Sequence, residues 1–139
     1  GHESAAIAGV YKMSAIEHTT GNYEMRMKVT DHTDKTSLPG IKQVYRSFDT
    51  QGMMAGDCIE LESAGFDTPG SVPLLTPALY GGAIVRPERA LPDIRKYVIA
   101  SVQSIPADVV RLMHPSRYPV SIGPALTETR KKMMHELSG

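Results

Sequence analysis

The most regular alternation of apolar and polar residues in the chain runs from residue 23 to residue 30. A period of two places successive side chains on opposite faces of a β-strand, so one face should pack on a core and the other should meet water or a polar partner. A weaker alternation covers residues 8–16, and the turn-forming sequence Thr19-Thr20-Gly21-Asn22 separates the two segments. The first thirty residues therefore predict two strands joined by a turn.

A second hairpin is predicted further along the chain. Residues 41–48 read as a strand that follows the turn Leu38-Pro39-Gly40. The sequence Asp49-Thr50-Gln51-Gly52 favours a tight turn, because aspartate is common at its start and glycine adopts the left-handed conformation often needed at its end. The return strand is expected over residues 54–62.

The second half of the chain changes character. Residues 63–73 are rich in Gly, Ser, Pro and Asp and predict a long connection, and residues 72–85 predict an irregular extended segment that pairs at a sheet edge. A helix is expected from Leu91, because Pro92 suits a first-turn position and Asp93 complements the helix dipole. Its apolar stripe is formed by Leu91, Ile94, Val98, Val102 and Ile105.

Three shorter elements complete the prediction: a short helix over residues 108–113, a short strand over residues 118–122 and a last helix from Gly123-Pro124. The predicted fold class is α+β, with an antiparallel, strand-rich N-terminal half made of hairpins, then an irregular segment and two to three helices. We expect a single domain over residues 1–139, divided into a strand-rich part (8–62), a linker (63–73) and an irregular and helical part (74–139).

Composition narrows the function classes. Fifteen basic and fifteen acidic residues give a formal net charge of zero, which argues against a general nucleic-acid or membrane-surface binder. The single cysteine, Cys58, has no partner for an internal disulfide and is expected to be a small core or edge residue in a reducing compartment, so we expect a cytoplasmic location. No apolar run approaches the roughly 20 residues that span a bilayer, so we expect a soluble chain.

Three basic residues surround the turn at Leu38-Pro39-Gly40: Lys35, Lys42 and Arg46. They are candidates for binding an anion. The alternative is an ordinary solvated hairpin end, since charged residues are mostly exposed.

Catalytic motifs are absent from the sequence. No two of the five histidines are four positions apart, and neither a phosphate-binding GxxxxGK[ST] loop nor a GxGxxG loop occurs, so we assign no metal ligand and no catalytic residue. Asp57, Glu60 and Glu62 could serve in acid–base catalysis. They lie on a predicted hairpin strand, however, where exposed structural carboxylates are the ordinary expectation.

Several longer segments resemble nicotinate phosphoribosyltransferase, in the same order over nearly the whole chain. They are AIAGVYKM (residues 6–13), RMKVTDHTDKTSLPGIKQVYR (26–46), PLL (73–75), LPDIRKYV (91–98) and HPSRYPVSIG (114–123). The segment KTSLPGIKQVYR carries most of the resemblance. Family members often read KLSE where this chain has Lys28-Val29-Thr30-Asp31, so no residue-level role is carried over there.

The resemblance implies the C-terminal domain of a larger enzyme, a glycosyltransferase or ligase of pyridine nucleotide salvage in NAD biosynthesis. That enzyme condenses nicotinate with phosphoribosyl pyrophosphate, with Mg and ATP expected in the parent and no cofactor in this domain. The catalytic α/β barrel would precede this chain, so the chain alone should be structural and inactive. The implied partners are the barrel and N-terminal domain of the same enzyme, and we expect a homo-oligomer without nucleic acid or membrane.

Under this interpretation Lys35, Lys42 and Arg46 are candidates for docking on the rest of the enzyme as well as for anion contact. Two other hypotheses remain open: an independent module that binds a small ligand or a protein, and a small hydrolase that uses Asp57 or Glu60. An enzyme domain without its neighbours should expose a large apolar surface, whereas an independent module should not.

Overall fold

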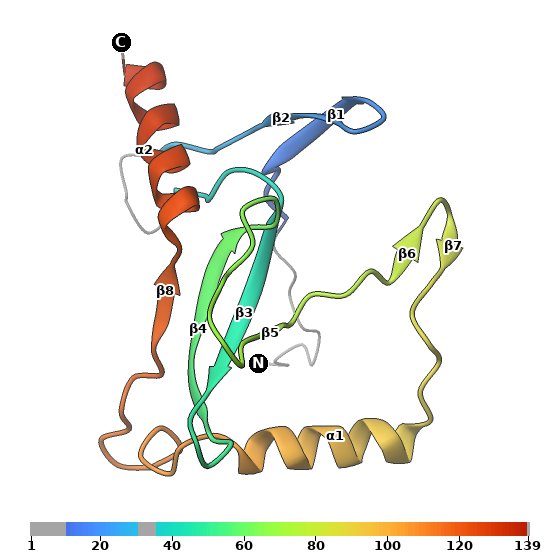
Figure 1. The fold of residues 1–139 in the computed structure, drawn as a ribbon, viewed down its shortest axis with the longest axis vertical. Coiled ribbons are helices and arrows are strands. Elements are labelled where there is room, and N and C mark those ends of the chain that lie inside the picture. Colours follow the sequence, from blue (N-terminus) through green and yellow to red (C-terminus); the bar gives the residue numbers. More distant parts are fainter. Residues whose placement is uncertain (1–10, 31–35, 139) are drawn as a thin grey trace, which may run out of the picture. The chain divides into compact units, whose positions relative to one another are not determined.

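The computed structural model describes residues 11–30 and 36–138, and Figure 1 shows their elements. Residue contacts divide the chain into two compact units, one made of Gly1–Ile41 with Glu128–Gly139 and the other of Lys42–Thr127. The two units are described separately below. The prediction of a single domain over residues 1–139 stays a prediction.

The first unit contains a small antiparallel hairpin of β1 (Ala15–Thr19) and β2 (Asn22–Met25). Gly21 adopts a φ of 80° in the turn, and its N–H donates to Glu17 Oε1 at 2.9 Å. The predicted turn is therefore confirmed, but β2 ends at Met25 and all four of its residues are exposed, so the expected buried face was wrong. Beyond it, the backbone N–H and C=O of Lys28 bond to the Oγ and N–H of Ser37 instead of extending the ladder.

The second unit is built on a four-stranded sheet with the order β5-β3-β4-β8. Its centre is the antiparallel hairpin of β3 (Lys42–Phe48) and β4 (Met54–Leu61). Asp49 closes the turn, because its Oδ1 accepts the N–H groups of Gln51 and Met53, both at 2.9 Å. Gly52 has the left-handed φ of 79° that the sequence predicts.

The two edges of this sheet differ. β5 (Val72–Pro73) pairs antiparallel with β3, which confirms the predicted edge pairing. Gln43 extends this edge: its side-chain amide both donates to and accepts from the backbone of Leu75. At the opposite edge β8 (Val120–Ile122) pairs parallel with β4, so the sheet is mixed. A parallel pair needs a crossover connection, and the long segment between β4 and β8 provides it.

A third hairpin, which forms a separate two-stranded sheet, was not predicted. It consists of β6 (Leu79–Tyr80) and β7 (Ala83–Ile84) around Gly81-Gly82, whose φ values are 55° and 80°. Positive φ values at both central residues suit the type of turn that joins two antiparallel strands directly. The glycine pair therefore marked a turn within the segment that the sequence predicted as irregular.

Two helices occur among the described residues, α1 (Leu91–Gln103) and α2 (Pro124–Ser138). Both begin where the sequence predicts. The expected short helix over residues 108–113 was wrong: turns occupy residues 107–110, and Ser116 N–H donates to the carbonyl oxygen of Asp108 at 2.9 Å. A helix this short gains few hydrogen bonds against its nucleation cost. The predicted α+β class, with hairpins and then helices, is confirmed.

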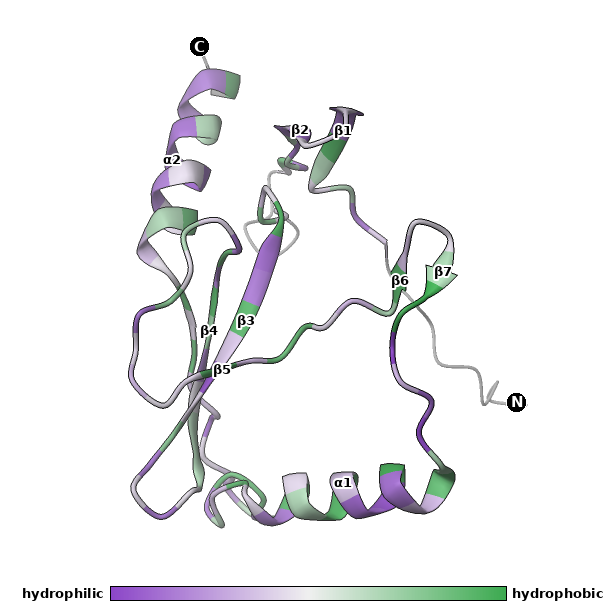
Figure 2. Cartoon of the chain, turned by 45° about the vertical axis from the view of Figure 1, so that its right-hand side comes forward, coloured by the Kyte–Doolittle hydropathy of each residue, from purple (hydrophilic) through white to green (hydrophobic). Residues whose placement is uncertain are grey.

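The buried apolar residues among those described are few: Pro39 before β3, Met54, Cys58 and Leu61 of β4, and Leu126 of α2. The buried position of Cys58 agrees with its predicted structural role. In contrast, α1 buries none of its residues, and Figure 2 shows apolar and polar residues alternating along this helix. Leu91, Ile94, Val98 and Val102 are between 40% and 78% exposed, so the stripe predicted to pack is largely open.

Candidate functional site

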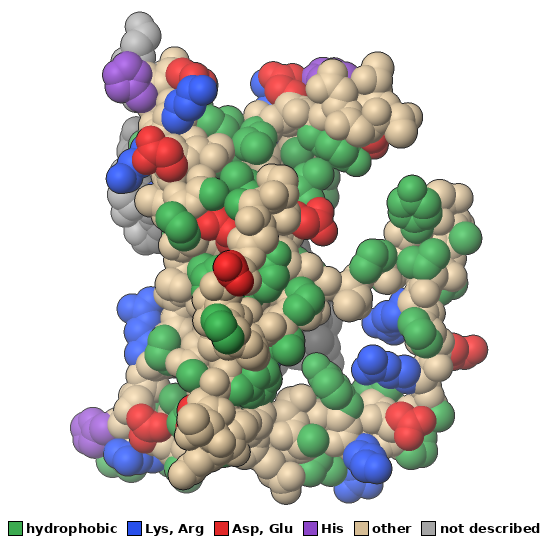
Figure 3. Space-filling view, in the orientation of Figure 1, with side chains coloured by type: hydrophobic (Ala, Val, Ile, Leu, Met, Phe, Trp, Pro, Cys, Tyr) green, Lys and Arg blue, Asp and Glu red, His purple; other side chains and the backbone are tan. Residues whose placement is uncertain are grey.

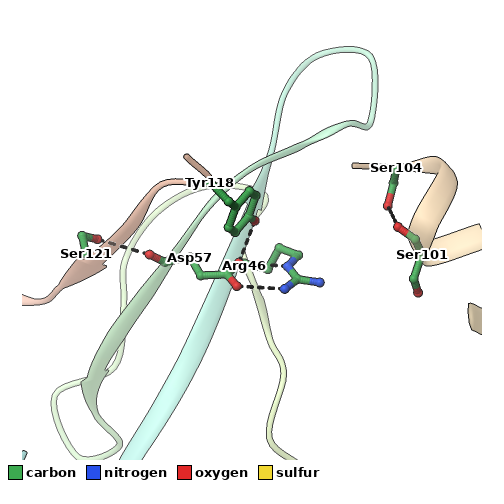
Figure 4. A network of polar contacts seen from close by, with 6 residues as sticks. All are labelled: Arg46, Asp57, Ser101, Ser104, Tyr118 and Ser121. Atoms are coloured by element: carbon green, nitrogen blue, oxygen red, sulfur yellow. Dashed lines mark hydrogen bonds and ion pairs between the residues drawn. The ribbon is translucent and has the colours of Figure 1, made fainter. Parts of the chain in front are cut away.

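Three side chains from separate segments of the second unit form a compact polar cluster (Figure 4). Arg46 on β3 donates from Nε to Asp57 Oδ1 and from Nη2 to Asp57 Oδ2, both at 2.8 Å. Arg46 and Asp57 are register partners in the hairpin, which places their side chains on the same face of the sheet. The Tyr118 hydroxyl, just before β8, donates to Asp57 Oδ1 at 2.9 Å.

The cluster shifts the pKa of each member. The hydrogen bonds from Arg46 lower the pKa of Asp57 below its usual range, and the Tyr118 hydrogen bond acts in the same direction. The bond to Asp57 raises the pKa of Arg46 further above its usual range. Burial raises the pKa of the Tyr118 phenol, and its hydrogen bond to Asp57 adds to this shift. The charged pair is thus stable at neutral pH and carries no net charge.

An apolar pocket of about 350 Å³ lies beside this cluster. Arg46 and Tyr118 contribute to its wall, together with Met54 at the start of β4 and the α1 residues Tyr97, Val98 and Val102. The carbonyl oxygen of Ser104, at the end of α1, accepts the N–H of Met54 at 2.7 Å, and this bond holds the helix end against the hairpin. A mainly apolar pocket with a few polar groups is a typical small-molecule site.

Glu60 occupies a different environment and is only 2% exposed. Its Oε1 accepts the N–H of Leu126 at 2.7 Å and that of Leu61 at 2.8 Å, while its Oε2 accepts the N–H of Ala125 at 3.0 Å. Ala125 and Leu126 lie in the first turn of α2, where backbone N–H groups lack partners within the helix. Glu60 therefore caps α2 from a neighbouring strand.

These positions decide between two earlier interpretations of the carboxylates. Asp57 and Glu60 were expected to be exposed, and this was wrong, because the Asp57 side chain is 12% exposed and Glu60 is 2% exposed. Both accept hydrogen bonds from donors within the protein. The structural role preferred for them is consistent with those contacts. A hydrolase that uses Asp57 or Glu60 is not supported, because the oxygen atoms of both side chains already accept hydrogen bonds from protein donors.

The three predicted anion-binding or docking residues fall in different places. Lys35 lies outside the described residues. Lys42 is half-buried on β3, and burial lowers its pKa. Arg46 is four positions further along the same strand and is engaged by Asp57. The assignment of these residues to anion binding or docking stays a prediction. The sequence did not identify Tyr118, because it is 61 positions from Asp57.

Two further properties of the described residues bear on the site. No group of three or more His, Cys, Asp or Glu side chains lies close enough to hold a metal ion within residues 11–30 and 36–138. No described helix is both long and apolar enough to cross a membrane.

Comparisons with known proteins point to one class of domain, the C-terminal domain of a phosphoribosyltransferase. Residues 66–130 match the family model described as the nicotinate phosphoribosyltransferase C-terminal domain. This match agrees with the resemblance to the C-terminal domain of that family that the sequence showed. This match includes β5, α1, Tyr118 and β8, but not the β3–β4 hairpin.

A solved structure shares the fold over a wider range. The crystal structure of human nicotinic acid phosphoribosyltransferase superposes with a TM-score of 0.62 at 21% sequence identity and covers 70% of this chain. The match covers only 24% of the human chain, so this chain corresponds to about a quarter of that enzyme's length. No curated protein sequence matches the chain.

Proposed function

We propose that this chain is the C-terminal structural domain of a nicotinate phosphoribosyltransferase. The parent enzyme would convert nicotinate and phosphoribosyl pyrophosphate to nicotinate mononucleotide and pyrophosphate, in the salvage route of NAD biosynthesis. The observation that carries this proposal is the family match over residues 66–130. The assignment to the glycosyltransferase or ligase class rests on the family resemblance, and the proposed cytoplasmic location rests on the single cysteine, Cys58.

A structural role for the domain itself is supported by what its polar groups do. The carboxylates of Asp57 and Glu60 bind Arg46, Tyr118 and backbone N–H groups, so neither is available as a base or nucleophile. Mg and ATP are expected in the parent enzyme. Asp57 and Glu60 do not fit a magnesium site, because Mg²⁺ needs open oxygen ligands and the oxygens of these two side chains already accept hydrogen bonds from protein donors. We therefore assign no step of the reaction to the described residues.

The proposed partners are the barrel and N-terminal domain of the same enzyme, and a further copy in a homo-oligomer. Exposed apolar side chains support this proposal. In Figure 3 hydrophobic side chains are visible over much of the surface, including the face along α1. Leu91 is 78% and Ile99 46% exposed. In a helix that packs on its own domain, such apolar side chains would face the core and be covered. Lys42 and Arg46 remain candidates for docking at this interface.

An activity assay tests the proposal. The natural protein that contains this chain should form labelled nicotinate mononucleotide from labelled nicotinate, phosphoribosyl pyrophosphate, Mg and ATP, whereas the chain of 139 residues alone should form none. Absence of product with the natural protein would overturn the assigned reaction. Product formation by the chain alone would overturn its structural role. No observation favours the alternative of an independent binding module.

A further inference from the structure

The pocket beside Arg46 has a chemical character that the proposed reaction does not explain. Its volume of about 350 Å³ lies within the range of small-molecule sites, and its wall is mostly apolar. All its lining residues belong to the unit Lys42–Thr127. It is therefore a property of one compact unit and of residues described together.

Arg46 provides the polar group of this pocket. Two of its three guanidinium nitrogens, Nε and Nη2, donate to Asp57. Figure 4 shows the third nitrogen, Nη1, pointing away from Asp57 toward the side of the view where Ser101 lies. Ser101 also lines the pocket. Within the described residues the Tyr118 hydroxyl also interacts with this guanidinium. No hydrogen bond that meets the geometric limits leaves Nη1, although a guanidinium has five N–H donors to satisfy.

The charges of the cluster determine which kind of ligand atom can accept a hydrogen bond from Nη1. Asp57 neutralises the charge of Arg46 at a separation of 2.8 Å, and both side chains are largely buried, at 22% and 12% exposure. An anion entering the apolar pocket would lose its hydration without meeting a net positive charge. A neutral carbonyl oxygen loses less hydration and accepts the same hydrogen bond.

The side chains of the wall favour an apolar body for the ligand. Val98 and Val102 on α1 and Met54 on β4 offer apolar side chains, and Tyr97 offers an aromatic ring. One face of that ring is occupied by Arg89, whose guanidinium carbon lies 5.5 Å from the ring centre. We propose that this pocket binds a planar apolar small molecule through a neutral carbonyl group, which accepts a hydrogen bond from Arg46 Nη1.

Three naphthalene probes separate the contributions: 2-acetylnaphthalene has a neutral carbonyl, 2-naphthoate has a carboxylate, and 2-ethylnaphthalene has neither. Each is titrated into the full chain while the methyl resonances of Val98, Val102 and Val109 are followed by NMR, with Val72 and Val120 as controls outside the pocket. We expect 2-acetylnaphthalene to bind about tenfold more tightly than 2-ethylnaphthalene, the usual effect of a hydrogen bond to a charged group. We expect 2-naphthoate to bind more weakly than the ketone.

Two variants with one matched control test the location. Arg46→Lys keeps a cation beside Asp57 but lacks the planar fork, so it should remove the preference for the ketone and leave 2-ethylnaphthalene binding within about twofold. Ser101→Phe should fill the pocket and abolish binding of both 2-acetylnaphthalene and 2-ethylnaphthalene. Lys96→Phe adds the same side chain to α1 at a position outside this pocket and should leave binding unchanged.

Several results would overturn the proposal. Equal affinity for the ketone and the hydrocarbon would remove the role of Arg46, and tighter binding of 2-naphthoate would show an anion site instead. Shifts at Val72 and Val120 as large as those at the pocket valines would show non-specific binding. Shifts of the pocket valines on raising the protein concentration alone would show that a second copy of the chain occupies the pocket. These outcomes do not depend on phosphoribosyltransferase activity.

Discussion

The carboxyl group of Glu60 lies where a side chain at Gly123 would begin. A Cβ atom placed on Gly123 would be 2.6 Å from Glu60 Cδ and closer still to Oε2. Glu60 cannot move aside without cost, because its oxygens accept three backbone N–H groups. Gly123 also donates its N–H to the carbonyl oxygen of Ile59 at 2.8 Å, so strand β4 and the start of α2 meet at this point.

Gly123→Ala should therefore destabilise the chain by about 1–3 kcal/mol, the usual cost of inserting a methyl group into a packed site. Urea unfolding followed by circular dichroism measures this change. In the double variant Gly123→Ala with Glu60→Ala the carboxyl group is gone and only the 3.1 Å approach to the Cβ of residue 60 remains, so the two effects should not add. Additive effects would contradict the direct contact.

Glu60→Gln should lower the free energy of unfolding by about 1–3 kcal/mol, because one oxygen acceptor becomes an amide donor facing backbone N–H groups. Glu62→Gln is the matched control, since Glu62 is exposed just beyond the end of the same strand, and its effect should stay within about 0.5 kcal/mol. Equal effects of the two substitutions would show that Glu60 does not cap α2.

Asp57→Asn should destabilise the chain at pH 7 by about 2 kcal/mol, because it leaves a partly buried Arg46 without its counter-charge. The folded-state pKa of Asp57 lies below the ordinary value of 3.8. Its stabilising contribution is therefore complete above that value and is lost as the pH falls through the folded-state pKa. Unfolding curves at pH 7 and at successively lower pH should show the difference between wild type and variant shrinking below about pH 4.

Asp67→Asn is the control for this measurement, because Asp67 is exposed in the connection after β4. Its effect should be small and should not follow the pH dependence of Asp57→Asn. A difference between wild type and Asp57→Asn that stays constant down to pH 2 would contradict the lowered pKa.

Tyr118→Phe keeps the ring but removes one of the donors to Asp57. The pKa of Asp57 should rise relative to wild type, and the free energy of unfolding should fall by about 0.5–1.5 kcal/mol. A carbon-detected NMR titration of the Asp57 carboxyl group measures the first change directly. An unchanged pKa would show that the tyrosine hydroxyl does not donate to Asp57 in solution.

The exposed side chains of α1 predict that the chain binds a dye specific for apolar surfaces. Leu91→Lys with Ile99→Lys should lower the dye fluorescence without loss of helical circular dichroism, since neither residue is buried. Glu88→Lys changes charge just before the helix and should not lower the fluorescence. A wild-type chain that binds no dye and sediments as a clean monomer would contradict the proposed docking surface.

The elements predicted correctly depend on contacts between near neighbours. The turn at Asp49 and Gly52 forms because an aspartate oxygen reaches N–H groups two and four positions away and glycine tolerates a positive φ. The starts of α1 and α2 follow from proline at a first-turn position. The short helix over residues 108–113 was predicted from similar local signals, but a single turn has too little intrinsic stability to persist.

The sequence by itself determined the turns of the β1–β2 and β3–β4 hairpins, the start of each helix and the family resemblance, because these depend on residues close together or on a matching order of motifs. Only the tertiary structure decided that β8 joins β4 in parallel, that Tyr118 reaches Asp57 across 61 positions and that Glu60 caps a helix 66 positions away. Strand alternation indicates which residues share a face but not what covers that face. An acidic residue on a strand is therefore expected in water until the fold brings donors to it, as α2 does for Glu60.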